Sequence, residues 1–222
     1  MAKPISIAID GPAGAGKSTI ARRLAKELGF YYVDTGAIYR TVAYFFDLWG
    51  VSPKDIDGIT RYIDELTIGI EYDDEGVQHM IMNGMDVTGD IRTPDLSQKA
   101  SLVSAHAIVR DLLLDMQREM AEKHNVIMDG RDIGTVVLPQ AQVKVFLTAS
   151  PEARAQRRMR ELEQRGTPQP LEQVLEEIRQ RDYNDSHRAA APLRAAEDAM
   201  VVDTSALDFD ASREALLALI RE

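Results

Sequence analysis

The stretch Gly11-Pro12-Ala13-Gly14-Ala15-Gly16-Lys17-Ser18 decides the fold, because it matches the pattern G-x-x-x-x-G-K-[ST] in full. A β-branched run at residues 5–9 precedes it and predicts a buried strand. After it, Ile20, Leu24 and Leu28 recur at the spacing of a helix. Glycines let such a loop curl so that its N–H groups point at phosphate oxygens, and the helix N-terminus adds partial positive charge. The stretch therefore predicts a nucleoside-triphosphate site.

Side chains of this loop predict how ATP would be held. Lys17 is expected to reach the β and γ phosphates, and a hydroxyl of Ser18 or Thr19 to contact Mg²⁺ or a phosphate. A loop that is merely flexible would need neither the lysine nor the helix. No N-K-x-D pattern is present, which disfavours a guanine-nucleotide switch. The residues expected to bind ATP are Gly11, Pro12, Ala13, Gly14, Ala15, Gly16, Lys17, Ser18 and Thr19.

The overall composition excludes several classes of protein. The chain has 222 residues, a net charge of −10 and no cysteine, and its four histidines lack metal-ligand spacing. Disulfides, thiol nucleophiles and a metal centre held by the protein alone are therefore not expected. The negative charge disfavours nucleic-acid polymers and anionic membranes as partners. With no apolar run long enough to span a bilayer and no signal segment, we expect a soluble, cytoplasmic, monomeric protein.

The charge is unevenly distributed along the chain. Residues 55–98 carry 2 basic and 11 acidic side chains, whereas residues 151–195 hold 9 of the 19 arginines and no lysine. The guanidinium fork binds phosphate in a bidentate way, so this arginine-rich segment favours phosphate recognition. The alternative is a solvated helix in which arginine and glutamate pair at helical spacing.

Short apolar strands alternate with helices along most of the chain. This pattern predicts an α/β fold with a central parallel sheet of five strands, in the three-layer αβα arrangement of P-loop proteins. A short helix is expected to begin at Ser52-Pro53, and residues 96–122 are expected to be mostly helical. The strands are expected at residues 5–9, 30–33, 126–128, 143–147 and 200–202.

The alternation is interrupted near residues 60–95. Alternating apolar residues at 66–72 and 78–82 flank the turn Asp73-Asp74-Glu75-Gly76, which predicts an antiparallel hairpin. We therefore expect one domain, residues 1–222, with an inserted subdomain at about 60–95 and a helical, arginine-rich lid at about 150–170.

Arginines follow several predicted strands at the sheet edge where open α/β folds bind ligands. Arg40 lies after the second strand, Arg131 after the third, and Arg154, Arg157 and Arg158 after the fourth. No pair of residues resembles a catalytic dyad that activates a nucleophile. A phosphomonoester acceptor needs none, because its second pKa is about 6 and it is already anionic at pH 7. It needs cations that hold two polyanions together and a lid that excludes water.

Three further segments carry a family resemblance. Residues 34–40 (DTGAIYR), 129–135 (DGRDIGT) and 181–188 (RDYNDSHR) resemble the signature segments of bacterial cytidylate kinases, in the same order and spacing as the phosphate loop. The resemblance implies a Mg²⁺-dependent, in-line transfer from ATP to CMP or dCMP, giving CDP or dCDP. The acidic insertion likewise resembles the subdomain with which these kinases bind the nucleoside monophosphate.

The resemblance also implies roles for individual residues. Those at the acceptor phosphate are Thr35, Arg40 and Arg131. Those at the cytosine edge are Ser101, Arg110 and Asp132, and those at the sugar and phosphate side are Arg181, Asp185 and Arg188. The residues implied to be catalytic are Lys17, Arg131, Arg157 and Arg158, the last two from the lid with Arg154.

The implied base contacts agree with the chemistry of cytosine. Its N4 amino group donates while N3 and O2 accept, which suits a carboxylate (Asp132) and a guanidinium (Arg110), whereas uracil presents the reverse pattern. Asp34 and Asp129 each follow a buried strand and could instead cap the next helix. Three alternatives remain open: a UMP/CMP-type kinase, a hydroxyl kinase of the shikimate or dephospho-coenzyme-A type with Asp34 or Asp132 as base, and a regulatory module that binds ATP without turnover.

Overall fold

The computed structural model describes residues 3–164 and 166–221. Its main sheet has five parallel strands in the order β2-β6-β1-β7-β8, which confirms the predicted fold class. Their bounds are Ser6–Asp10 (β1), Tyr31–Asp34 (β2), Val126–Gly130 (β6), Val143–Thr148 (β7) and Met200–Asp203 (β8). The phosphate-loop strand β1 is central, so the loop lies in the middle of the carboxyl edge of the sheet.

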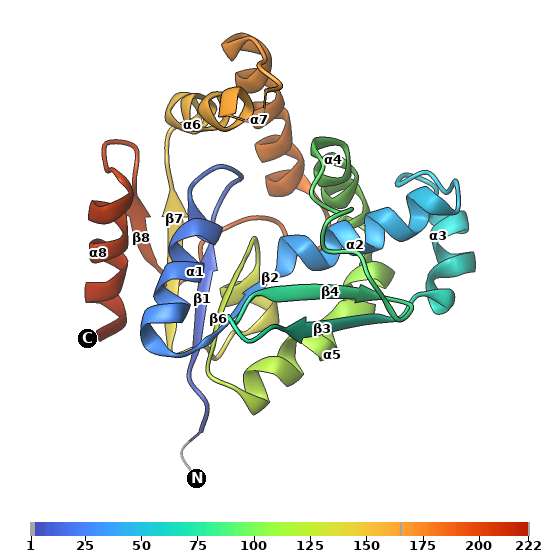
Figure 1. The fold of residues 1–222 in the computed structure, drawn as a ribbon, viewed down its shortest axis with the longest axis horizontal. Helices are drawn as coiled ribbons and strands as arrows, with labels where there is room; N and C mark the ends of the chain where they lie inside the picture. Colours follow the sequence, from blue (N-terminus) through green and yellow to red (C-terminus); the bar gives the residue numbers. More distant parts are fainter. Residues whose placement is uncertain (1–2, 165, 222) are drawn as a thin grey trace.

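Helices cover both faces of this sheet (Figure 1). On one face α1 (Lys17–Leu28) and α8 (Phe209–Arg221) pack on Ile7, Ile9 and Leu147. On the other face the core is built around Ala8 and Val33. The helices of that face are α2 (Thr35–Leu48), α4 (Pro94–Val103) and α5 (Ala107–Lys123). Successive residues of β1 alternate between the two cores, as the side chains of a strand must.

The interruption in the strand–helix alternation is a three-stranded antiparallel sheet, β3-β4-β5. The predicted hairpin is present as β3 (Ile68–Tyr72) and β4 (Gln78–Met82). The sequence did not predict β5 (Met85–Asp86), because two residues carry no periodic signal. Met80 and Met82 are buried in the same core as Phe45 of α2, so the inserted sheet packs against the main domain.

Two helix boundaries differ from the prediction. The short helix expected at Ser52-Pro53 is α3 (Ile56–Tyr62), followed by a 3₁₀ turn at Ile63–Glu65. It begins later because the carboxylate of Asp55 accepts a hydrogen bond from Gly58 N at 3.0 Å. The helical run at 96–122 is broken after α4, where the Ser104 hydroxyl donates to the Ser101 carbonyl. This break becomes part of the site described below.

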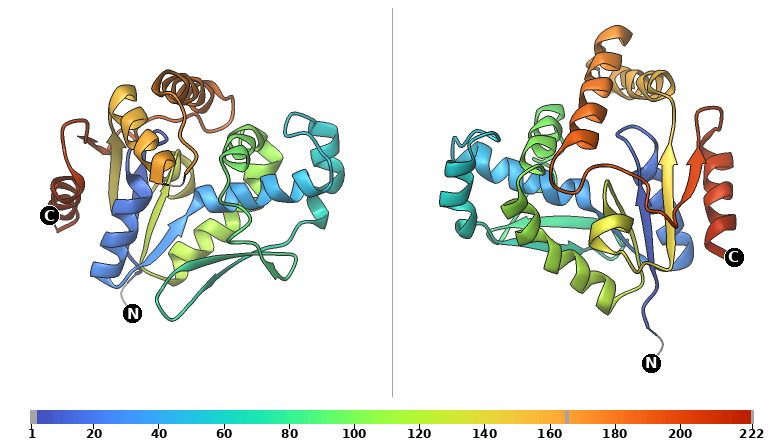
Figure 2. Two further views of the ribbon diagram at one scale, coloured as in Figure 1. Left: turned by 45° about the horizontal axis from the view of Figure 1, so that its top comes forward. Right: turned by 180° about the vertical axis from the view of Figure 1, so that it is seen from behind.

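The arginine-rich segment forms a helical hairpin of α6 (Pro151–Gln164) and α7 (Leu171–His187). The hairpin has a small core of its own, made by Ala155, Leu162, Val174 and Ile178, and it projects from the end of the molecule opposite the N-terminus (Figure 1). Residues 188–199 then run across the sheet to β8 (Figure 2). In the described residues, no helix has the length and apolar character needed to cross a membrane.

Candidate active site

The phosphate loop joins β1 to α1 and packs tightly against β7. A Cβ atom added at Gly11 would lie 1.9 Å from the carbonyl oxygen of Leu147, and Gly11 has a φ of 146°. Only glycine therefore fits this position. Lys17 is the first residue of α1 and is 5% exposed, with its Nζ donating to the carbonyl of Pro12 at 2.8 Å. The loop thus lies between a strand and a helix, as the sequence predicts, and Lys17 is bonded within the loop.

Asp129, the penultimate residue of β6, is the carboxylate nearest to the loop hydroxyl. Its Oδ2 accepts from Ser18 Oγ and its Oδ1 from the Tyr32 hydroxyl, both at 2.8 Å. Thr35 Oγ1 donates to the backbone carbonyl of Asp129 at 2.7 Å. Burial raises the pKa of Asp129, and the neighbouring Asp34 carboxylate raises it further.

The structure shows that Asp129 is not a helix cap, so this alternative is wrong for Asp129 and confirmed only for Asp34. A signal for its role was present in the sequence, because the apolar run 126–128 ends in this aspartate. In P-loop proteins a strand of that kind carries the acidic residue at the nucleotide-bound metal.

Asp34 and Arg40 form a pair at the start of α2. The Asp34 side chain caps the helix by accepting from Ala37 N at 2.9 Å, and its other oxygen accepts from Arg40 at 3.1 Å. The Nε of Arg40 is buried and has no hydrogen-bond partner among the described residues. The pair uses one of the five N–H donors of Arg40, so further donors, among them the buried Nε, remain for a ligand, while both carboxylate oxygens of Asp34 already accept a hydrogen bond.

Lys17, Arg131 and Arg181 come together beside the loop. Burial lowers the pKa of Lys17, and the positive charges of Arg131 and Arg181 lower it further. Burial likewise lowers the pKa of Arg181 to about 10, with smaller contributions from Arg131 and Arg40. Arg181 Nε is a second buried donor without a hydrogen-bond partner among the described residues, and it lies 4.0 Å from Asp185 Oδ2. Lys17 of α1, Arg40 of α2, Arg131 after β6 and Arg181 of α7 are therefore close enough for their charges to influence one another, and such a four-cation cluster suits a polyanion.

Asp185 of α7 joins Arg131 to α4. Its Oδ2 accepts from Arg131 Nε at 2.9 Å and its Oδ1 from Ser101 Oγ at 2.8 Å. Burial alone would raise the pKa of Asp185, but Arg131 and Arg181 outweigh it and the pKa is lowered. Asp185 is thus ionised and orients a guanidinium of the cation cluster.

Asp132 lies between two arginines in a second buried cluster. Arg110 donates to its Oδ2, and Arg188 donates to its Oδ1 at 3.2 Å. Burial raises the pKa of Asp132, and the two arginines oppose that shift. Ser104, which the sequence did not single out, holds both arginines, since its carbonyl accepts from Arg110 at 3.3 Å and its hydroxyl from Arg188 at 3.0 Å. No local pattern marks Ser104, because its partners lie far along the chain or across the break between α4 and α5.

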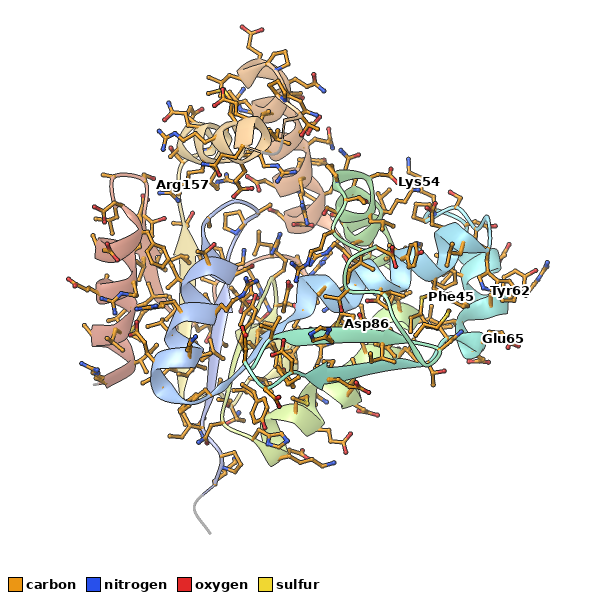
Figure 3. The ribbon with its side chains drawn as sticks, viewed as in Figure 1. Phe45, Lys54, Tyr62, Glu65, Asp86 and Arg157 are labelled. Carbon is orange, nitrogen blue, oxygen red and sulfur yellow. The ribbon has the colours of Figure 1, made fainter. Side chains whose placement is uncertain are left out.

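The three arginines after β7 hydrogen-bond to groups outside the cation cluster, and Arg154 also donates to the carbonyl of Ala13 in the phosphate loop at 3.1 Å. Arg154 is buried and pairs with Asp182 of α7 at 2.6 Å. Arg157, which is labelled in Figure 3, donates to the carbonyl and hydroxyl oxygens of Thr204, after β8. Arg158 pairs with Glu161 on its own helix at 3.0 Å. Arg157 thus links the hairpin to the segment after β8, whereas the pair of Arg154 with Asp182 joins α6 to α7 and that of Arg158 lies within α6. In the described residues none of the three hydrogen-bonds to the side chains of Lys17, Arg131 or Arg181.

A family model described as cytidylate kinase matches residues 7–222. The chain belongs to the cytidylate kinase family. A cytidylate kinase of Exiguobacterium sp. is 47% identical over 222 residues, which are 100% of this chain and 99% of that protein. Another, of Carboxydothermus hydrogenoformans, is 50% identical over 214 residues, 96% of each chain. Among solved structures, a shikimate kinase of Bacteroides thetaiotaomicron has a TM-score of 0.48 at 15% identity, covering 98% of this chain and 99% of that one.

Membership of the cytidylate kinase family confirms the resemblance seen in residues 34–40, 129–135 and 181–188. The chain is a nucleoside monophosphate kinase that uses ATP and CMP. Because the match is to cytidylate kinases over the full chain, the hydroxyl-kinase and regulatory alternatives are set aside.

Proposed function

We propose that the four-cation cluster is where the two phosphate groups of the reaction meet. The loop amides and Lys17 hold the phosphates of ATP, and Arg40, Arg131 and Arg181 hold the phosphate of CMP or dCMP, with Thr35 beside it. The observation that supports this assignment is the proximity of Lys17, Arg131 and Arg181, since the charge of Arg131 lowers the pKa values of both Lys17 and Arg181. Buried like charges are unfavourable by themselves, and two polyanions remove that penalty.

The transfer needs few proton movements. A phosphate oxygen of the acceptor, already anionic at pH 7, attacks the γ phosphorus in line, and the bond from that phosphorus to the β–γ bridging oxygen breaks. ADP leaves with the electron pair of that bond. Lys17 and the arginines stabilise the charge on the transferring group, which is the main contribution that a protein makes to this chemistry.

The residues next to the loop fit a magnesium ion. Ser18 supplies a hydroxyl and Asp129 a carboxylate, in contact with each other at 2.8 Å. Mg²⁺ prefers hard oxygen ligands and is held in such enzymes by one or two carboxylates together with substrate phosphates. Within residues 3–164 and 166–221 no group of three or more potential metal-binding side chains occurs. When bound, the ion neutralises charge on the phosphates of ATP.

The Asp132 cluster is placed to read cytosine. Arg110 and Arg188 each use one lone pair of a different carboxylate oxygen, which leaves a further lone pair on each oxygen for the N4 amino group. The guanidinium of Arg110 would donate to the acceptors N3 and O2 of the base. Asp185, which accepts from Ser101 Oγ at 2.8 Å, is assigned to the sugar, and Ser101 keeps its assignment to the cytosine edge.

The helical hairpin is assigned as the lid. Its core of Ala155, Leu162, Val174 and Ile178 is separate from the two main cores, so α6 and the first part of α7 can move as one unit while Arg181 and Asp185 stay in the site. Closure would bring Arg157 and Arg158 to the transferring phosphoryl group and release Arg157 from Thr204. In this account the two lid arginines act only in the closed enzyme.

A compound that joins adenosine to cytidine through a 5′–5′ pentaphosphate tests the shared cluster. It is expected to compete with both ATP and CMP and to bind about 10²-fold more tightly than CMP, because its second contact is intramolecular. Initial-rate inhibition and calorimetry measure this. The matched control is the adenosine–uridine compound, which should bind more weakly. Competition with ATP alone would contradict the shared cluster and leave only a donor site.

A further inference from the structure

The outer edge of β2 is covered by side chains of the inserted sheet. In the main sheet β2 pairs with β6 on one side and forms the edge on the other. Backbone groups on such an edge need partners. Here the Tyr72 hydroxyl donates to the carbonyl of Tyr32 at 2.9 Å, and Gln78 Oε1 accepts from Asp34 N at 2.7 Å. Two side chains thus take the place of a neighbouring strand.

These side chains come from one point of the insertion. Tyr72 and Gln78 lie opposite each other in the β3–β4 ladder, next to the turn at residues 73–77, and Figure 1 shows this turn close to β2. Gln78 is 7% exposed, and its Nε2 lies 3.4 Å from the carbonyl of Asp34. Its amide therefore offers Asp34 both the acceptor and the donor that a paired strand would offer.

Asp34 is the residue through which this contact reaches the acceptor site. Its backbone is held by Gln78, and its carboxylate caps α2 and binds Arg40 at 3.1 Å. The next residue, Thr35, is held by the carbonyl of Asp129. A shift of the Asp34 backbone would therefore move the start of α2 and the guanidinium of Arg40 together.

We propose that Gln78 is a positioning residue for the acceptor phosphate, acting through Asp34 on Arg40, and that this contact is the task of the hairpin end of the insertion. The inference rests on the proposed role of Arg40. The proposal assigns a function to the acidic insertion that does not depend on its negative charge, because the contact with β2 is made by the uncharged amide of Gln78.

The variant Gln78→Met tests the proposal, because it keeps the length of the side chain and removes both polar atoms. The KM for CMP is expected to rise about tenfold, which corresponds to 1.4 kcal/mol. The KM for ATP and the kcat at saturating CMP should stay within about twofold, because the donor side does not contact Gln78. Steady-state kinetics with each substrate varied in turn measures this split, which a general loss of stability would not produce.

Asn83→Gly is the matched control. Asn83 is an amide in the same insertion, with its Oδ1 accepting from Thr67 N at 2.7 Å and its Nδ2 donating to the Glu65 carbonyl at 3.0 Å. It does not contact β2, and glycine tolerates its φ of 49°. The control should destabilise the insertion and leave the KM for CMP within about twofold of the parent value. An equal rise in both variants would overturn the proposal.

Arg40→Ala distinguishes a failure of the proposed acceptor site from a failure of the positioning role of Gln78. If Arg40→Ala raises the KM for CMP and Gln78→Met does not, the positioning role is wrong and the acceptor site stands. If Arg40→Ala has no effect, the acceptor site is wrong and the positioning role falls with it.

Hydrogen exchange gives a second measurement that does not depend on turnover. The amide of Asp34 should exchange slowly in the parent protein and at least about tenfold faster in Gln78→Met, because its acceptor is gone. The amide of Ala37, which is bonded to Asp34 Oδ1, should follow it. Unchanged exchange at Asp34 would overturn the proposal even if the variant proved too unstable for kinetics.

Discussion

Asp132→Ala is expected to lower kcat/KM for CMP by about 10³-fold and that for UMP far less, because a site built to pair with a polar group discriminates strongly when the pairing is lost. The carboxylate is 3% exposed and is the acceptor that the N4 amino group of cytosine requires. Uracil carries an acceptor at that position, so it gains nothing from Asp132 in the parent enzyme. Parallel kinetics with CMP and UMP measures the ratio.

Asp132→Ala also removes the carboxylate partner of two buried guanidinium groups. The effect of that loss on stability must be distinguished from the loss of cytosine recognition. Arg110 and Arg188 both bind Asp132, so the variant will be less stable whatever the substrate. Asp132→Asn is the control for shape, because it keeps the volume and loses the charge. An equal loss of activity with CMP and UMP in Asp132→Ala would contradict the base-reading role.

Lys17→Met should reduce kcat by about 10³-fold or more, because preorganised cations supply most of the stabilisation of a phosphoryl transfer. Burial and the charges of Arg131 and Arg181 lower the pKa of Lys17, so the charged form is disfavoured in the free protein. Removing that charge should therefore leave the free protein as stable as the parent or more stable, in contrast to Asp132→Ala.

Two measurements test whether Lys17→Met lowers activity without lowering stability. Single-turnover kinetics should show the loss in the chemical step, and thermal unfolding should show a Tm that is unchanged or higher. Lys26→Met on the same helix is the control, because Lys26 is exposed and remote from the loop. A fall in Tm that accounts for the lost activity, or a kcat within about tenfold of the parent, would contradict the role of Lys17.

Much of the fold could be predicted because it depends on local apolar runs. Each of the five main strands is such a run, and the glycine-rich loop after β1 places the ligand edge. The order of the strands and the π-helical turn at Ile133–Val137 could not be predicted, since they depend on contacts between distant segments. This turn is held by Asp10, which accepts from Ile133 N at 2.8 Å and Gly134 N at 2.7 Å, across more than one hundred residues.

The residues of the candidate site likewise fall into those that a sequence motif predicts and those that only the folded structure identifies. The segments that carried the family resemblance supply Arg40, Arg131 and Asp132, and the structure places each of them at the carboxyl edge of the sheet. Gln78 and Ser104 have no motif, because their importance comes from partners that the fold brings to them. The importance of Gln78 and Ser104 therefore follows from their hydrogen bonds in the folded protein and not from the local sequence.

The most direct measurement is the turnover of Mg²⁺–ATP with CMP, dCMP, UMP, AMP, GMP and shikimate in parallel. CMP and dCMP should be the best acceptors, each forming its diphosphate with one ADP, and excess chelator should abolish turnover. UMP should trail them, because Asp132 faces the wrong partner on uracil. Absence of turnover with both cytidylates, or UMP, AMP or GMP accepted as well as CMP, would contradict the account.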